Sequence, residues 1–229
     1  MKKHIPNSLT LLNLFSGCCG IVACMQHQYY LVPIFISISL LADFLDGFVA
    51  RALKVKSDLG GQLDSLADMV TFGVLPGVML FTLSSSTTAF CCNNLFPYTG
   101  FIYSVFACLR LAKFNLDTRQ TVDFIGLNTP SGAIFVLGLY CNYFIFGNKL
   151  PILYQPITLA IIAIILAFLM VAEFPMFSLK GNLFSWKQNK FRLLLILSII
   201  PQFLIFSWLG LSTIILTYII FAFIQRKLV

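Results

Sequence analysis

The sequence predicts an all-α polytopic membrane protein, and its composition and apolar pattern carry this prediction. The chain has 229 residues, of which 59% are hydrophobic and only 10% are charged, and its mean hydropathy is +0.92. A soluble domain carries about a quarter charged residues, so this chain lacks the polar groups to cover a surface in water. Its apolar runs are long enough to span a bilayer and are separated by short polar breaks, which is typical of membrane helices.

Eight apolar segments follow one another along the chain. Pro6 and Asn7 open the first segment. Pro33 lies near the start of the second and Pro151 begins the sixth, because proline suits the first turn of a helix. Pro201 lies inside the seventh segment, where proline favours a kink. The expected segments are residues 8–26, 31–53, 60–83, 95–114, 129–147, 152–173, 191–207 and 209–225.

The basic residues predict how these segments are oriented. With the N-terminus inside, fourteen of the 15 Lys and Arg residues fall on the cytoplasmic face, and only Lys149 falls on the other. We therefore expect a multi-pass protein of the cell membrane, with both termini and the active site on the cytoplasmic side. The same charges account for the net charge of +7, and their scatter over several loops argues against nucleic-acid binding.

Five of the eight acidic residues lie in one stretch, DFLDGFVARALKVKSDLGGQLDSLAD, at positions 43–68. Asp43 and Asp46 are three residues apart and share a face of the second segment. Gly60, Asp64 and Asp68 recur every four residues and form one stripe on the third. Because the two segments form a hairpin, we expect the four carboxylates to converge near the cytoplasmic surface.

Divalent cations are the partners that such a carboxylate group needs. Each ionised group in a membrane helix costs about 2.5–3.5 kcal/mol, and mutual repulsion adds to that cost. Two divalent ions would balance four carboxylates, and an all-oxygen site suits Mg²⁺ or Mn²⁺ rather than zinc. The chain has no CxxC pair, and its two His residues have no metal-ligand spacing. Such a site suits phosphoryl chemistry on a diphosphate.

A structural alternative is that these aspartates cap helices and pair with the basic residues of the turn. That interpretation suits Asp58, which lies in the turn itself. It does not suit Asp43 and Asp64, which lie a turn or more inside their helices, where an ionisable residue is a functional candidate by default.

The stretch also resembles the signature of the CDP-alcohol phosphatidyltransferase family, D-x2-D-G-x2-A-R-x8-G-x3-D-x3-D. Members of that family move a phosphatidyl or similar group from a CDP-linked lipid to an alcohol and release CMP. The resemblance implies a six-helix core over residues 1–175, followed by a linker and two further membrane helices over 176–229, and it implies a homodimer. The matching positions are Asp43, Asp46, Gly47, Ala50, Arg51, Gly60, Asp64 and Asp68.

The resemblance also assigns roles to these positions. It implies that Asp43, Asp46 and Asp64 ligate metal and that Asp68 is the general base for the attacking hydroxyl, with Asp68 also counted among the metal ligands. The expected CDP-lipid site includes two asparagines of IPNSLTLLNLFSG, a stretch similar to the phosphatidylserine synthase branch of the family. The residues of this expected CDP-lipid site are Asn7, Asn13, Gly47, Ala50, Arg51 and Gly60.

Two further stretches resemble the same branch and imply transfer of the phosphatidyl group from CDP-diacylglycerol to L-serine. In LRLAKFN, Arg110 and Lys113 are expected to bind the serine carboxylate, although this branch more often has Arg at the second position. In FIGLNTPSG, Asn128 and Thr129 depart from the branch pattern F-x-G-L-P-S-P and are also assigned to the serine site.

Two other functions stay open at this point. A phosphatidylglycerophosphate or inositol-type synthase of the same family would take a phosphorylated acceptor, for which a denser basic cluster is expected. A cation transporter or channel would place its ionisable residues along a conducting path on several helices.

Overall fold

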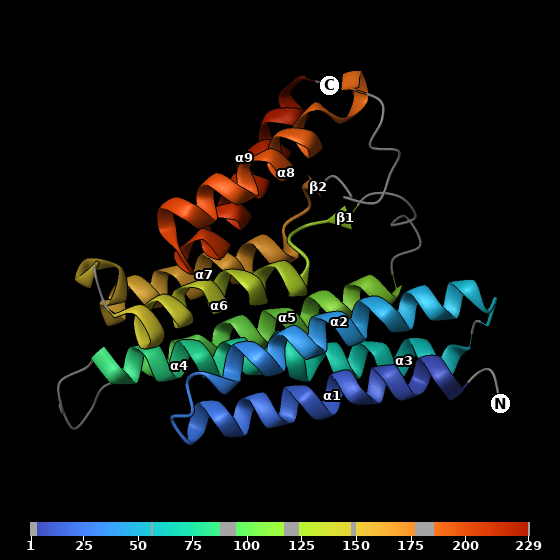
Figure 1. The fold of residues 1–229 in the computed structure, drawn as a ribbon, viewed down its shortest axis with the longest axis horizontal. Coiled ribbons are helices and arrows are strands. Elements are labelled where there is room, and N and C mark those ends of the chain that lie inside the picture. The colour runs from blue at the N-terminus through green and yellow to red at the C-terminus, as the bar shows by residue number, and fades with distance from the viewer. Residues whose placement is uncertain are drawn as a thin grey trace.

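The computed structural model describes residues 4–55, 57–87, 95–116, 124–147, 150–176 and 186–228. The described chain is almost entirely helical (Figure 1), which confirms the all-α prediction. Several residues that bear on the sequence predictions, among them Lys56, Arg119 and Lys149, lie outside the described residues. The helices are α1 His4–Met25, α2 Leu31–Ala52, α3 Asp58–Asp68, α4 Leu75–Thr87, α5 Gly100–Leu116, α6 Thr129–Phe146, α7 Pro156–Val171, α8 Trp186–Phe206 and α9 Leu209–Leu228.

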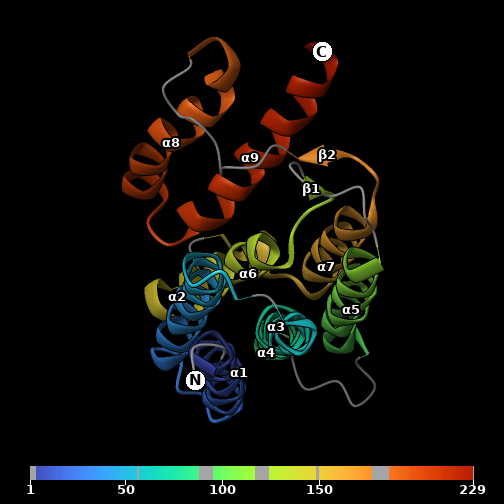
Figure 2. The same cartoon turned by 90° about the vertical axis from the view of Figure 1, so that its right-hand side faces the viewer.

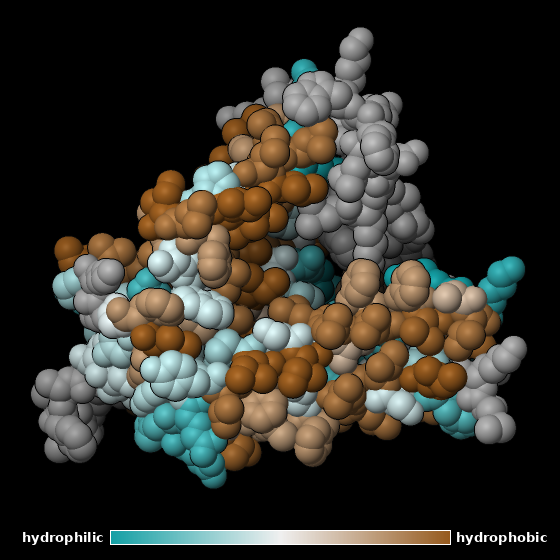
Figure 3. Space-filling view, in the orientation of Figure 1, coloured by the Kyte–Doolittle hydropathy of each residue, from teal (hydrophilic) through white to brown (hydrophobic). Residues whose placement is uncertain are grey.

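Length and composition mark the chain as an integral membrane protein. In the described part of the chain, four helical spans are long and apolar enough to cross a bilayer: α1, α2, the continuous span Asp58–Thr87 and α6. Helix α7 and the 209–225 part of α9 are shorter apolar helices. Hydrophobic surface lies over α8 and along α2 in the space-filling view (Figure 3), as expected for side chains that face lipid.

The third membrane span contains a π-helix, η1, over Met69–Val74, directly after Asp68. A π-helix leaves main-chain groups with irregular hydrogen bonds. Two side chains of α5 compensate, because Tyr103 donates to the carbonyl oxygen of Phe72 at 3.1 Å and Ser104 donates to that of Gly73 at 2.9 Å. The span predicted as one helix over 60–83 is therefore one helical rod from 58 to 87 with an internal change of pitch.

Helices α1 to α7 form a bundle, seen nearly end-on in Figure 2. α1 pairs with α2, α3 packs on α1, and α5 packs on α7. The last two helices, α8 and α9, pair with each other and lie across one side of the bundle (Figures 1 and 2). α9 is fixed to α6, where Ser212 donates to the carbonyl oxygen of Phe135 at 2.7 Å and a Cβ added to Gly138 would meet the Ser212 main chain at 2.7 Å.

The sixth segment begins later than its pattern predicts. Pro151–Tyr154 form a 3₁₀ turn, η3, and α7 begins only at Pro156. Gln155 is extended, with φ −62° and ψ 142°, because a residue before proline is driven out of the helical region. In the fourth segment, predicted over 95–114, a 3₁₀ turn, η2 (Phe96–Thr99), likewise precedes α5. By contrast, α8 continues from 186 to 206 with Pro201 inside it.

One short antiparallel ribbon was not predicted. β1 (Phe124–Ile125) pairs with β2 (Pro175–Met176) in the register Phe124 with Met176 and Ile125 with Pro175. Gly126 follows β1 with a φ of +74°, and an added Cβ would meet the carbonyl oxygen of Met170 at 2.7 Å. This ribbon ties the start of α6 to the end of α7.

Candidate active site

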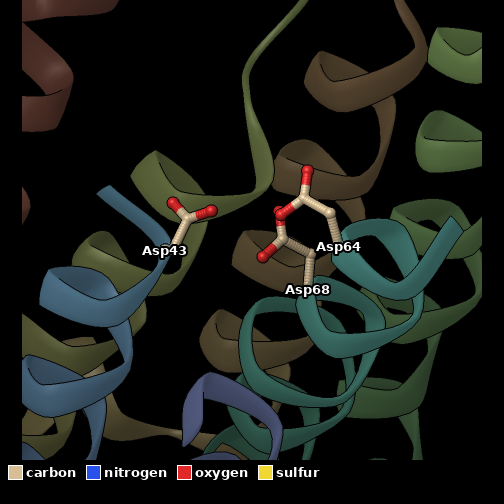
Figure 4. Close-up of side chains that lie close together, drawn as sticks. All are labelled: Asp43, Asp64 and Asp68. Atoms are coloured by element: carbon tan, nitrogen blue, oxygen red, sulfur yellow. The ribbon is translucent and has the colours of Figure 1, made fainter. Parts of the chain in front are cut away.

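Three aspartates from two helices form an acidic cluster, defined as Asp43, Asp64 and Asp68. Asp43 projects from α2, and it faces Asp64 and Asp68 of α3 across the gap between the helices (Figure 4). One oxygen from each carboxylate lies within 4.8 Å of the others, and all three side chains are partly buried. The cluster confirms that the hairpin of α2 and α3 brings these carboxylates together.

The turn between α2 and α3 sets this arrangement. Lys54 adopts a left-handed conformation with φ 53°, which ends α2 and reverses the chain. Ser57 then caps α3, because its hydroxyl accepts the Gly60 N–H at 3.0 Å. The side chain of Asp58 lies in the first turn of α3, where a negative charge is favourable.

Asp46 is not one of the three aspartates of the acidic cluster, but it lines the same cavity as Asp64, so its expected place among the metal ligands stays a prediction. Its side chain is 6% exposed, and its Oδ2 accepts a hydrogen bond from Thr10 Oγ1 of α1 at 2.5 Å. Helical spacing explains the difference, since residues three apart point about 60° apart around the helix axis. Asp46 is thereby turned toward α1 while Asp43 faces α3.

A cavity of about 890 Å³ opens beside the carboxylates. Three aspartates, Asp46, Asp58 and Asp64, form part of its wall together with small residues and polar side chains, most of them from α1, α2 and α3. Four of the residues predicted for the CDP-lipid site line it, namely Asn7, Gly47, Ala50 and Gly60.

The two other predicted CDP-lipid residues do not line this cavity. Arg51 is exposed at the end of α2, and a Cβ added to Gly47 would lie 3.4 Å from its Nη1. The Arg51 guanidinium therefore lies beside Gly47, at the edge of the cavity. Asn13 is fully buried in α1, and its Nδ2 donates to Asp68 Oδ1 at 3.2 Å. Its observed partner is a carboxylate of the acidic cluster.

The glycines of α3 differ in how much space they leave. A Cβ added to Gly60 would meet Ser57 Oγ at 2.9 Å and Asn7 Oδ1 at 3.2 Å. The adjacent Gly61 has nothing within 4 Å of an added Cβ. An added Cβ at Gly60 would thus press on two side-chain atoms at the cavity wall, whereas Gly61, which also lines the cavity, faces open space.

The residues predicted for the serine site lie in two different environments. Arg110 of α5 is only 7% exposed, and Asp68 and Tyr103 are among its electrostatic neighbours. Its Nε has no hydrogen-bond partner in the described part of the chain, whereas Lys113, one turn further along, is exposed. Asn128 caps α6 by accepting the Ser131 N–H at 2.8 Å.

Thr129 is the fourth residue predicted for the serine site. It is buried at the first position of α6, and its hydroxyl has no partner among the described residues. Its main-chain oxygen accepts from Tyr103 Oη at 3.4 Å, so Tyr103 links the start of α6 to the π-helix in the third span.

The comparisons with known proteins identify the family. The model of the CDP-alcohol phosphatidyltransferase family matches residues 3–224. The chain belongs to this family. The boundary expected at residue 175 lies within the match and stays a prediction.

The curated relatives share about a third of their residues with this chain. A CDP-diacylglycerol–serine O-phosphatidyltransferase of Bacillus subtilis is 34% identical over 182 residues, which is 76% of this chain and 92% of that protein. The enzyme of the same name from Mycobacterium leprae is 37% identical over 152 residues, 62% of this chain and 48% of that protein. The one from Methanocaldococcus jannaschii is 33% identical over 152 residues, 65% of this chain and 67% of that protein. The match thus spans about half of the longer mycobacterial relative.

The donor set of this family member fits a hard divalent cation. The acidic cluster offers only oxygen atoms, which are the ligands that Mg²⁺ and Mn²⁺ prefer. The Asp64 Oδ1 atom is buried and has no hydrogen-bond partner among the residues that the structure describes. A buried carboxylate oxygen without a partner is costly, and a cation would satisfy it.

The sequence pattern missed the polar residues that hold this site in place. Thr10 lies in the stretch IPNSLTLLNLFSG, but its position along the sequence does not indicate that it donates a hydrogen bond to Asp46 of another helix. Ser65 donates to Asn115 Oδ1 at 3.0 Å and joins α3 to α5. Such contacts depend on how helices pack, which one sequence does not reveal.

Proposed function

We propose that the chain transfers the phosphatidyl group of CDP-diacylglycerol to the hydroxyl of L-serine and releases CMP. The observation that carries this proposal is the acidic cluster of α2 and α3 beside a glycine-lined cavity, in a chain of this family. The names of the relatives from three organisms support serine as the acceptor.

Two divalent cations, Mg²⁺ or Mn²⁺, are proposed as cofactors. Asp43, Asp64 and Asp68 would hold them together with Asp46, which borders the same cavity. Bound there, the cations would neutralise the charge of the diphosphate and acidify the attacking hydroxyl. The protein residues supply the negative charge and the geometry that select such ions.

Asp68 is proposed as the general base. The serine hydroxyl oxygen forms a bond to the phosphatidyl phosphorus, and the bond from that phosphorus to the CMP oxygen breaks. The hydroxyl proton passes to Asp68, and CMP leaves with the electron pair of the broken bond. The hydrogen bond from Asn13 fixes one oxygen of Asp68 at 3.2 Å, so the carboxylate is oriented before substrate binds.

The cavity is the proposed site of the CDP group. Gly47, Ala50 and Gly60 have little or no side chain, so a nucleotide diphosphate can approach the main chain of α2 and α3 closely. Asn7 offers a carboxamide from α1, and Arg51 at the edge of the cavity is proposed to contact the phosphates.

The acceptor side is proposed to lie against α5. L-serine carries a carboxylate, and a buried guanidinium is a strong partner for it. Arg110 is such a group, because it is buried, Asp68 is among the charges that act on it, and its Nε has no partner among the described residues. Lys113, Asn128 and Thr129 stay predictions for this site.

We also propose the cell membrane as the location, with both termini and the active site on the cytoplasmic side. The support is the distribution of Lys and Arg along the sequence. A homodimer stays a prediction from the family resemblance.

The test is CMP release by the purified protein with CDP-diacylglycerol and Mn²⁺. We expect CMP only when L-serine is added. Equal release with glycerol 3-phosphate or inositol would replace serine synthesis by the phosphatidylglycerophosphate or inositol-type alternative. Cation flux in proteoliposomes without CMP formation, and lost in Asp64→Asn, would instead favour a transporter or channel.

A further inference from the structure

Helix α1 carries none of the four aspartates but contacts both helices that do. Thr10 and Asn13 lie three residues apart, on neighbouring positions of one face of α1, and they are 4% and 0% exposed. Thr10 bonds Asp46 of α2 at 2.5 Å, and Asn13 bonds Asp68 of α3 at 3.2 Å. One side of α1 therefore holds one carboxylate from each helix of the acidic hairpin.

Asn13 is itself fixed from two sides. Its main-chain oxygen accepts hydrogen bonds from Ser39 Oγ of α2 at 3.1 Å and from Thr71 Oγ1 of η1 at 3.2 Å. One turn further along α1, Gly17 leaves room for Thr71, because an added Cβ would collide with its hydroxyl. The main chain of α1 at Asn13, from which the carboxamide projects, is thus held relative to α2 and to the π-helix.

Neutral hydrogen-bond donors such as Thr10 and Asn13 are suited to orienting carboxylates that bind a cation. A hydroxyl or a carboxamide orients a carboxylate and leaves its charge in place, whereas Lys or Arg would cancel the charge that attracts a cation. Each donor also occupies one oxygen only, Oδ2 of Asp46 and Oδ1 of Asp68. The second oxygen of each carboxylate then points in a defined direction, since a buried hydrogen bond restricts rotation of the group.

We propose that Thr10 and Asn13 are a pair of positioning residues, which aim the second oxygen of Asp46 at the divalent cations and that of Asp68 at the same cation site and the attacking hydroxyl. This inference rests on the proposed function, because it takes the aspartates as the metal site. Neither residue touches substrate or metal in this proposal, and each acts through a carboxylate. Loss of such outer partners typically weakens metal binding or activity by about 10- to 100-fold.

The variants separate positioning from packing. Thr10→Val and Asn13→Leu keep side-chain shape and remove the donor, while Thr10→Ser restores a hydroxyl. Ser16→Ala is the matched control on α1. Ser16 is equally buried and reaches α2 by a hydrogen bond, but its acceptor is the Phe35 main-chain oxygen at 2.9 Å rather than a carboxylate.

The readout is Mn²⁺ binding to the purified, substrate-free protein in detergent, followed by the electron paramagnetic resonance signal of free Mn²⁺. We expect the half-saturating Mn²⁺ concentration to rise about 10-fold or more in Thr10→Val and in Asn13→Leu. Thr10→Ser and Ser16→Ala should stay within about threefold of the parent, because neither removes a donor to a carboxylate. Parent-like binding in the two donor-less variants, or an equal loss in Ser16→Ala, would overturn the proposal.

The other possible outcomes also distinguish the positioning role from the metal site and from the proposed function. If Asn13→Leu fails to give a monodisperse protein, the comparison of Thr10→Val with Thr10→Ser answers the question for Thr10, and equal binding in these two rejects the pair. A parent protein that binds no Mn²⁺ overturns both the metal site and the positioning role. A parent that binds Mn²⁺ with the expected variant pattern but releases no CMP with serine overturns the proposed function alone.

Discussion

The two ends of the hairpin formed by α1 and α2 are built in different ways. At the α1–α2 turn, rings fill the space: Tyr29 stacks on Phe144 at 3.9 Å between ring centroids, and Tyr140 lies 4.8 Å from the same ring. At the opposite end, the acidic cluster holds three carboxylates within 4.8 Å beside a cavity. Like charges at that distance repel each other. The acidic end therefore lowers the stability of the fold, whereas the packed rings at the aromatic end raise it.

This difference separates a packing region from a binding region. The chain has 24 phenylalanines with which to fill a gap, yet it leaves an open cavity next to its aspartates. Polar groups in a membrane protein are costly and are placed where function needs them. If function is confined to the acidic end, substitutions there should change activity, and substitutions at the aromatic end should change mainly stability.

The largest effect is expected from Asp64→Ala. Removing this carboxylate takes a ligand from the proposed cation site, and the rate of CMP release should fall by about 10³-fold or more, equivalent to about 4 kcal/mol of transition-state stabilisation. Helix content and elution volume should match the parent, because the carboxylate contributes charge rather than packing. A folded Asp64→Ala protein with more than a tenth of the parent activity would remove the basis for the metal site.

A smaller and more selective effect is expected from Arg110→Lys. The charge is kept but the fork of donors is lost, and a charge-assisted hydrogen bond contributes about 1.5–3 kcal/mol. The KM for serine should therefore rise at least about tenfold, with the KM for CDP-diacylglycerol unchanged. Lys113→Ala, at the exposed neighbour, should change the serine KM less. A parent-like serine KM in Arg110→Lys would exclude Arg110 from the acceptor site.

The adjacent glycines of α3 provide a matched pair with a still smaller effect. Gly60→Ala would press against Ser57 and Asn7 at the cavity wall, so we expect the KM for CDP-diacylglycerol to rise several-fold. The Cβ added by Gly61→Ala meets no atom within 4 Å, and the substitution adds helix propensity of up to about 1 kcal/mol. It should therefore raise the melting temperature and change the KM for CDP-diacylglycerol less than Gly60→Ala does. A KM for CDP-diacylglycerol that matches the parent value in both variants would place the nucleotide elsewhere.

The smallest effect on activity is expected at the aromatic end. Tyr154 donates to the Leu139 main-chain oxygen at 3.2 Å in the buried core. Tyr154→Phe should lower the free energy of unfolding by about 1 kcal/mol, and CMP release at a temperature well below unfolding should match that of the parent. A loss of activity comparable to that of Arg110→Lys would contradict the division between the two ends.

The spacing of residues was sufficient to predict much of this architecture. Long apolar runs predicted the membrane helices, and the four-residue stripe of Asp64 and Asp68 predicted which face of α3 lies toward Asp43. The late start of α7 follows from Pro156, a local signal that the prediction from Pro151 did not take into account. The ribbon of β1 and β2 has two residues in each strand, too few to produce a readable alternation.

The site was less predictable where it depends on contacts between helices. Asp46 lines the same cavity as Asp64, but its spacing from Asp43 did not indicate that its side chain accepts a hydrogen bond from Thr10 of α1. Asn13 was expected at the nucleotide, and its partner is Asp68. The π-helix after Asp68 has no local sequence signal, since its irregular hydrogen bonds are compensated by Tyr103 and Ser104 of another helix.

The most direct test of the metal site is anomalous diffraction at the manganese absorption edge from crystals grown with Mn²⁺ and a CDP-lipid. Anomalous peaks should lie among Asp43, Asp64 and Asp68, close to Asp46 and to the diphosphate oxygens in the cavity. Well-ordered side chains at these four positions with no anomalous peak between them, under saturating Mn²⁺, would contradict the account.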